Sequence, residues 1–303
     1  MNTNERALQL LEQNRYEESL DQFQKAVQQE RTVQSLTNLA WMYCNEMEED
    51  EKAFPLLQEA ISLNPTSPFP FRLLGEMYLR EEKWLLAEKM LIKSINIAPS
   101  RITYYNLGIA YYKLSQFKKA ASYFLMASDD SDYSFYGYVV CLIKDERKSE
   151  AKKQMKAFRR DAPNFVGEIE MADLYVELHC YKEAVTWYEK GWNDYFKDPH
   201  WISGFMYALF QMNDMPRAQE LLQSLLMEKK QNIKDAKEDR DESWSEDDRK
   251  GYIKDELKHL KEFENMIKNV ASLSHPDLEF TPSFQTDCYL FGCPSHHHPE
   301  YNK

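Results

Sequence analysis

The stretch FRLLGEMYLREEKWLLAEKMLIKSINIAP, residues 71–99, decides the fold of this 303-residue chain. It begins with a bulky residue, and a Leu-Gly pair and a tyrosine follow at helical spacing. A second set then brings an aromatic residue, an alanine, a leucine, a serine and a closing proline. This spacing predicts two amphipathic helices joined by a short turn, with the proline ending the second. The residues that carry the pattern are Phe71, Leu74, Gly75, Tyr78, Trp84, Ala87, Leu91, Ser94 and Pro99.

The same arrangement returns along the chain around one small residue. Successive small residues are 34, 34, 33, 31, 33 and 34 positions apart, and a large apolar residue lies four positions after each. Self-similarity at this period predicts a solenoid of helical hairpins. The small side chains let paired helices approach closely, and the large ones fill the space between hairpins. The small residues are Ser19, Ala53, Ala87, Ala120, Ala151, Ala184 and Ala218.

This position-specific pattern resembles the tetratricopeptide repeat. About seven repeats cover residues 2–229, and the match is strongest in the units around Ala53, Ala87 and Ala120. Units five and six depart from it, for example where Lys148 replaces the aromatic residue. The resemblance implies an all-α, right-handed α-α superhelix whose first helices line a concave groove. It also implies a protein-interaction scaffold that binds a protein or peptide there.

The composition narrows the classes of partner. The formal net charge of −12 argues against nucleic acid and against an anionic membrane surface. It favours protein partners with a basic segment, because opposite charges speed the encounter. We find no signal peptide and no run of 18 apolar residues, and five cysteines suit reduced thiols better than a disulfide framework. We therefore expect a cytoplasmic protein.

Two segments follow the repeats. Residues 230–251 are dense in charges of both signs and predict either a charged linker or an extension of the preceding helix. Residues 252–273 carry apolar side chains three or four apart, which predicts an amphipathic helix. We interpret it as a helix that caps the last hairpin, since solenoids need a polar outer cap. The alternative is a partner-binding or dimerising helix.

The resemblance also implies which side chains face the groove, and in the middle of the chain these are mostly aromatic or apolar. Tyrosine suits an interface because it combines a large ring with a hydrogen-bonding hydroxyl. The alternative is that packing between neighbouring first helices buries these side chains. The family's carboxylate clamp is not reproduced, and only Asn38 and Asn106 occupy candidate clamp positions. The candidate partner-binding residues are Trp41, Arg72, Tyr105, Ile109, Tyr112, Tyr133, Tyr136, Tyr207 and Phe210.

The tail, residues 274–303, carries four prolines that exclude a long helix. Three interpretations stay open for it. Thiolate and imidazole are zinc ligands, so Cys288, Cys293, His296 and His298 predict a zinc site, structural or functional. The tail could instead be a disordered or surface-docked segment whose cysteines and histidines have no role. In the third interpretation its aromatic residues dock into the chain's own groove and regulate access; these are Phe280, Phe284, Tyr289 and Phe291.

Signatures of catalysis are missing from the sequence. It has no glycine-rich phosphate loop, no H-E-x-x-H motif and no G-x-S-x-G elbow. We therefore expect a non-catalytic scaffold that requires no cofactor, with zinc at the tail as the alternative.

Overall fold

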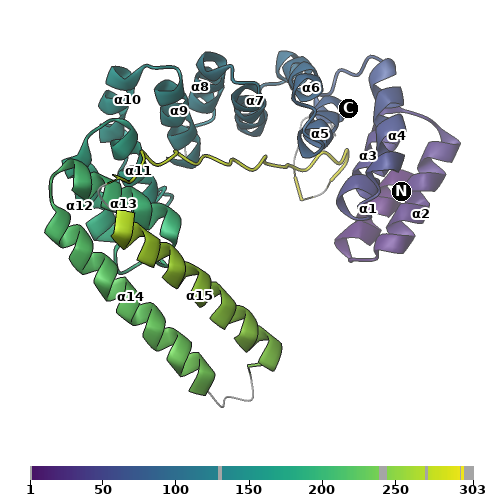
Figure 1. Ribbon diagram of the computed structural model, residues 1–303. Helices are drawn as coiled ribbons and strands as arrows, with labels where there is room; N and C mark the ends of the chain where they lie inside the picture. Colours follow the sequence, from purple (N-terminus) through teal and green to yellow (C-terminus); the bar gives the residue numbers. More distant parts are fainter. Residues whose placement is uncertain (1, 129–131, 239–243, 270–271, 294, 297–303) are drawn as a thin grey trace. The chain divides into compact units, whose positions relative to one another are not determined.

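The computed structural model describes residues 2–128, 132–238, 244–269, 272–293 and 295–296 (Figure 1). Within those ranges the chain forms α-helices, turns, extended segments and one short 3₁₀ turn, and no strand. It divides into two compact units: residues 1–155 with 281–303 form unit 1, and residues 156–280 form unit 2. The predicted all-α class is confirmed.

Unit 1 contains five helical hairpins in series. In each hairpin the first helix packs along the second, and the second contacts the first helix of the next. The helices are α1 (Thr3–Glu12), α2 (Tyr16–Gln29), α3 (Val33–Asn45), α4 (Asp50–Ser62), α5 (Phe69–Arg80), α6 (Trp84–Ile97), α7 (Arg101–Lys113), α8 (Phe117–Met126), α9 (Asp132–Lys144) and α10 (Lys148–Gln154), with the 3₁₀ turn η1 (Met155–Ala157) after α10. The first helices α3, α5, α7 and α9 also contact one another in order. Together they form what we call the first-helix face of unit 1.

Unit 2 supplies the sixth and seventh predicted hairpins and one further helix. Its helices are α11 (Glu168–Glu177), α12 (Tyr181–Gly191), α13 (Pro199–Gln211), α14 (Met215–Glu238) and α15 (Glu246–Asn269). α11 packs along α12, α13 contacts both α12 and α14, and α14 packs along α15. None of the described helices combines the length and apolarity that crossing a membrane would need.

The periodic small residues lie at the closest approach of the paired helices. All seven, from Ser19 to Ala218, are fully buried, and so are the large residues four positions after them. The two glycines of the strongest repeats show how tight this contact is. A Cβ atom added at Gly75 would lie 2.7 Å from Leu91 Cδ2, and one at Gly108 would lie 2.7 Å from Phe124 Cδ1. The period therefore marks positions where the fold has no room for a larger side chain.

The turn inside each hairpin carries a second period, which the pattern of small and apolar residues does not predict. Every hairpin has one non-glycine residue with positive φ, five positions before its periodic small residue. This left-handed conformation closes the end of the first helix, and it usually favours glycine. The chain has only 8 glycines, so no glycine signal points to these turns. The residues are Asn14, Glu48, Glu82, Ser115, Glu146, His179 and Asn213.

The charged region after the repeats is helical over more of its length than predicted. α14 continues to Glu238, which fits a helix extension, and α15 begins at Glu246 rather than at residue 252. A buried ion pair explains why a polar stretch pairs as helices: Lys229 Nζ lies 2.7 Å from Glu256 Oε1, and both side chains are almost fully buried. Removing one partner would leave the other side chain buried without its ion pair, so this contact links α14 to α15.

The apolar side of α15 is narrower than its sequence suggests. Phe263 is fully buried in the core of unit 2. Leu257, which the apolar spacing placed on the same side, is 48% exposed. The neighbouring residue Glu256 is buried instead, and its side chain pairs with Lys229. Val270, a further apolar residue of the predicted helix, lies outside the described residues.

Replacing Gly108 by alanine tests whether close helix approach limits the fold. Alanine has the higher helix propensity by about 0.8–1.0 kcal/mol. Its Cβ would overlap the Phe124 ring, and overpacking of this kind costs about 1–3 kcal/mol. We expect Gly108→Ala to lower the free energy of unfolding by about 1 kcal/mol, measured by chemical denaturation.

Gly251 provides the matched control because it lies inside α15 with nothing within 4 Å of an added Cβ. Gly251→Ala should stabilise the protein by up to about 1 kcal/mol. Equal stabilisation by both substitutions would show that helix approach at Gly108 is not limiting.

Candidate functional site

The first-helix face of unit 1 is covered by the chain's own C-terminal segment. Residues 281–290 form no helix or strand and follow an extended course (Figure 1), and a turn follows at Phe291–Gly292. We call residues 281–293 the docked segment. It runs from α7 across α5 to α3, so that it crosses the hairpins in the reverse of their chain order (Figure 1).

Two asparagines hold the backbone of the docked segment at its two ends. Asn106 on α7 donates from Nδ2 to the Gln285 carbonyl at 2.7 Å, and the Gln285 amide donates back to Asn106 Oδ1 at 2.9 Å. Asn38 on α3 makes the same pair of bonds with Phe291, at 3.0 and 2.8 Å. Each side-chain amide thus pairs with both the backbone N–H and the backbone carbonyl of one residue. Both asparagines are fully buried, so these bonds lie away from water.

Between the two asparagines, side chains of the docked segment enter the core of unit 1. The Tyr289 hydroxyl donates to Glu76 Oε1 on α5, and the Tyr289 side chain is 1% exposed. The Phe69 ring contacts the rings of both Tyr289 and Phe291, with centroids 5.8 and 5.2 Å apart. Leu290 is also buried in this cluster. Burying Leu290 and Phe291 contributes about 1.5–3 kcal/mol each before the entropy cost of ordering the segment.

Burial makes Glu76 an unusual carboxyl group. Its removal from water raises the pKa of Glu76 well above the ordinary glutamate range. The hydrogen bond from Tyr289 acts in the opposite direction, as do the charges of Arg72 and Arg80, while the charge of Asp287 raises the pKa further. Because the docked segment covers Glu76, the state of this carboxyl group and the docking of the segment are linked.

Most of the predicted partner-binding residues in unit 1 are buried. Tyr105 is 1% exposed and packs edge-on against Phe124 of the same hairpin, with ring centroids 5.5 Å apart. Ile109 and Tyr136 are also buried. Arg72 donates to Ser94 Oγ at 3.1 Å and to the Ala98 carbonyl at 2.8 Å, so it ties α5 to the end of α6.

The other predicted residues of unit 1 are more accessible. Tyr133 is 40% exposed and stacks on Tyr136, with centroids 6.2 Å apart. Tyr112 is half-buried beside Phe117, and Trp41 is partly buried against the core of unit 1. Contact of any of these side chains with a partner stays a prediction.

In unit 2, the two predicted residues Tyr207 and Phe210 are half-buried on α13. The segment before residue 281 reaches Tyr207: the His275 ring lies edge-on to it, with centroids 5.2 Å apart. His275 Nδ1 also lies 3.8 Å from Glu177 Oε1 on α11. The chain after α15 therefore covers first helices within unit 2 as well.

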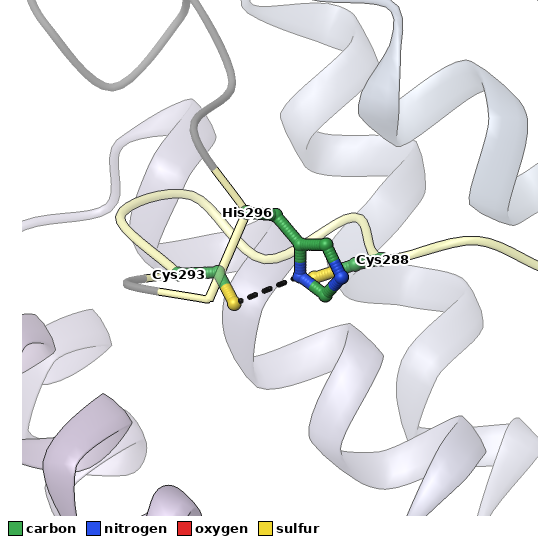
Figure 2. Close-up of side chains that lie close together, drawn as sticks. All are labelled: Cys288, Cys293 and His296. Atoms are coloured by element: carbon green, nitrogen blue, oxygen red, sulfur yellow. Dashed lines mark hydrogen bonds between the residues drawn. The ribbon is translucent and has the colours of Figure 1, made fainter.

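The Cys/His cluster of the tail forms where the docked segment turns (Figure 2). Cys288, Cys293 and His296 each offer one ligand atom, and these three atoms lie within 4.8 Å of one another. Cys293 Sγ lies 3.3 Å from His296 Nδ1. Burial raises the pKa of the Cys288 thiol to about 12. His298, the fourth predicted ligand, lies outside the described residues.

Of the three interpretations of the tail, docking onto the chain's own first helices agrees with where the structure places residues 281–293. Tyr289 and Phe291 are buried in unit 1, Phe284 is partly buried, and Phe280 is buried within unit 2. The aromatic pattern of the tail predicts docking through these side chains but not the bonds that hold its backbone. Asn38 and Asn106 occupy candidate positions of a carboxylate clamp in the sequence, whereas in the structure they bind the backbone of the docked segment.

Comparisons with known proteins support the fold. No family model and no curated protein sequence matches the chain. A solved tetratricopeptide repeat protein from Parabacteroides merdae superposes with a TM-score of 0.52 at 16% identity, covering 80% of this chain and 98% of that one. PilF of Pseudomonas aeruginosa gives a TM-score of 0.46 at 18% identity, covering 64% and 90%. Yeast Tom70 gives 0.43 at 15% identity, covering 84% and 51%. With the serial hairpins, the first likeness shows a tetratricopeptide-type fold, as the repeats predict.

The linkage between Glu76 and docking predicts a pH dependence. When the segment leaves, water reaches Glu76 and its pKa should return toward about 4.3. The docked state then binds the proton more tightly. Docking is therefore strongest at a pH at or below the undocked pKa of about 4.3, and it weakens as the pH rises to the raised pKa of the docked state. Between the undocked and the docked pKa of Glu76, the equilibrium constant for docking should fall by up to about tenfold per pH unit. The docked fraction can be followed by the NMR signals of the Tyr289 ring.

Glu76→Gln should remove this slope, because an amide does not titrate. Glu88→Gln is the control, since Glu88 accepts a hydrogen bond from Tyr111 and does not contact the docked segment. A slope of the same size in Glu76→Gln, or tighter docking at higher pH, would contradict the linkage.

Proposed function

We propose that this chain is a non-catalytic protein-interaction scaffold whose first-helix face in unit 1 binds an extended segment of a partner protein. The docked segment occupies that face in the resting protein and gives way when the partner binds. The observation that carries the proposal is the paired bonding of Asn38 and Asn106 to the backbone of the docked segment. A serial stack of hairpins supplies the surface, and the extended backbone bound there supports an extended peptide as the ligand.

The contacts divide the recognition into two parts. Bonds from Asn38 and Asn106 to backbone atoms accept any extended chain, so they provide affinity without reading side chains. The positions that hold the Tyr289 and Phe291 side chains provide selectivity, since both of these alternate side chains contact the Phe69 ring. Glu76 adds a hydrogen-bond acceptor for a hydroxyl group at the position that holds Tyr289. The expected partner motif is therefore an extended Tyr-x-Phe-like sequence.

The covalent link between segment and face sets the level of competition. A tethered segment acts at an effective concentration in the millimolar range, so a free partner needs higher affinity to displace it. The apparent affinity for a partner falls in proportion to the fraction of chains with an open face. The formal charge of −12 favours partners that carry basic residues beside the motif, because opposite charges accelerate the encounter.

A peptide of residues 281–293 tests the proposal with a defined ligand. In the full chain, Tyr289→Ser with Phe291→Ser weakens the docked segment and leaves every residue of the face unchanged. We expect this open variant to bind the labelled peptide at least about tenfold more tightly than the wild type, because fewer faces are occupied. Fluorescence anisotropy measures the affinity.

A third substitution then tests the face itself. Adding Asn106→Ala to the open variant removes two hydrogen bonds to the peptide, worth about 0.5–1.5 kcal/mol each. We expect a loss of affinity of about tenfold or more. Asn96→Ala is the control, since Asn96 is exposed on α6 away from the docked segment. Unchanged binding in the Asn106 variant, or no binding by the open variant, would refute the proposed recognition.

A further inference from the structure

The turn at the end of the docked segment gathers three metal-binding side chains from a short stretch of chain. The Cys293 amide lies 3.3 Å from the Leu290 carbonyl, and the His296 amide lies 3.4 Å from the Cys293 carbonyl. These two turns fold the chain back, so that Cys293 and His296 return to Cys288 (Figure 2). Gly292 lies inside the first of these turns and adopts φ +81°, a conformation that strongly favours glycine.

We propose that Cys288, Cys293 and His296 form a zinc site that fastens the docked segment to unit 1. Zinc binds thiolate sulfur at about 2.3 Å and imidazole nitrogen at about 2.0–2.1 Å, so tetrahedral ligand atoms lie about 3.5–3.8 Å apart. The three ligand atoms lie within 4.8 Å of one another, and Cys293 Sγ is 3.3 Å from His296 Nδ1. Small side-chain adjustments bring this set onto one ion.

The donor set selects the metal. Two thiolates with one imidazole suit zinc far better than the hard cations calcium and magnesium, which prefer oxygen ligands. Three protein ligands leave a fourth tetrahedral position for water. His296 is exposed, which gives the ion and that water access from solvent.

The site lies where a metal would act on the docked segment. Cys288 and Cys293 pack against the core of unit 1, and they flank Tyr289, Leu290 and Phe291, which are buried in it. A zinc ion would close the loop from Cys288 to His296 and reduce its conformational freedom when undocked. The bound metal therefore favours the docked conformation. The consequence for partner access rests on the proposed function, but zinc binding and the fastening of the segment do not.

Zinc binding by the full chain, kept reduced with a phosphine, tests the site directly. Titration with Zn²⁺ against a chromophoric chelator should give one tight site per chain. Cys288→Ser, Cys293→Ser and His296→Ala should each weaken it by about a hundredfold or more. Cobalt(II) should give a thiolate charge-transfer band that the two cysteine variants reduce.

Controls separate this site from other thiols and imidazoles of the chain. Cys180→Ala and His200→Ala change a buried cysteine and an exposed histidine within unit 2, and both should keep full zinc affinity. Circular dichroism checks that every variant remains helical. Substoichiometric zinc in the wild type, or equal affinity in the Cys288 and Cys180 variants, would overturn the proposal.

Hydrogen exchange tests the fastening without any partner. Zinc should slow exchange of the Phe291 amide by at least about tenfold in the wild type, and it should have no effect in His296→Ala. Tight zinc binding with unchanged exchange at Phe291 would overturn the fastening. Peptide binding by the open variant is measured separately, so failure of the zinc site leaves the proposed function standing and the reverse also holds.

Discussion

Close approach of paired helices is the constraint on which the rest of this structure depends. One small residue per hairpin is fully buried, and at Gly75 and Gly108 even a methyl group would overlap the next helix. This contact sets the spacing of each hairpin. The spacing in turn lines up the first helices α3, α5 and α7, and so places Asn38, Glu76 and Asn106 along one face. The binding chemistry follows from a packing rule that contains no functional residue.

The docked segment provides hydrogen-bond and packing partners for the buried groups of that face. Without it, the buried amides of Asn38 and Asn106 would lose their backbone partners, and the Phe69 ring would lose its contacts with Tyr289 and Phe291. Groups of this kind are costly to leave unpaired away from water. A segment of the same chain satisfies them at little entropic cost because it is already tethered. Any partner that replaces it has to offer equivalent contacts.

The sequence predicts the hairpins well because their determinants are local and periodic, as the recurring alanines illustrate. It predicts less where the determinant is a contact distant in sequence. The early start of α15 accompanies the pair between Lys229 and Glu256, which charge patterning did not reveal. Docking of the tail is one of three interpretations of its sequence, because its aromatic residues do not predict which helix each of them contacts. The roles of Asn38 and Asn106 were hidden because bonds to backbone leave no trace in the sequence of the segment.

Amide hydrogen exchange of the unmodified full chain tests the central claim most directly. The Gln285 and Phe291 amides donate to buried asparagine side chains, whereas the neighbouring Thr286 is exposed. If the segment occupies the first-helix face in solution, the Gln285 and Phe291 amides should exchange at least about tenfold more slowly than that of Thr286. Exchange of all three at the rate of an unstructured chain would contradict the account, because the face would then be open at rest.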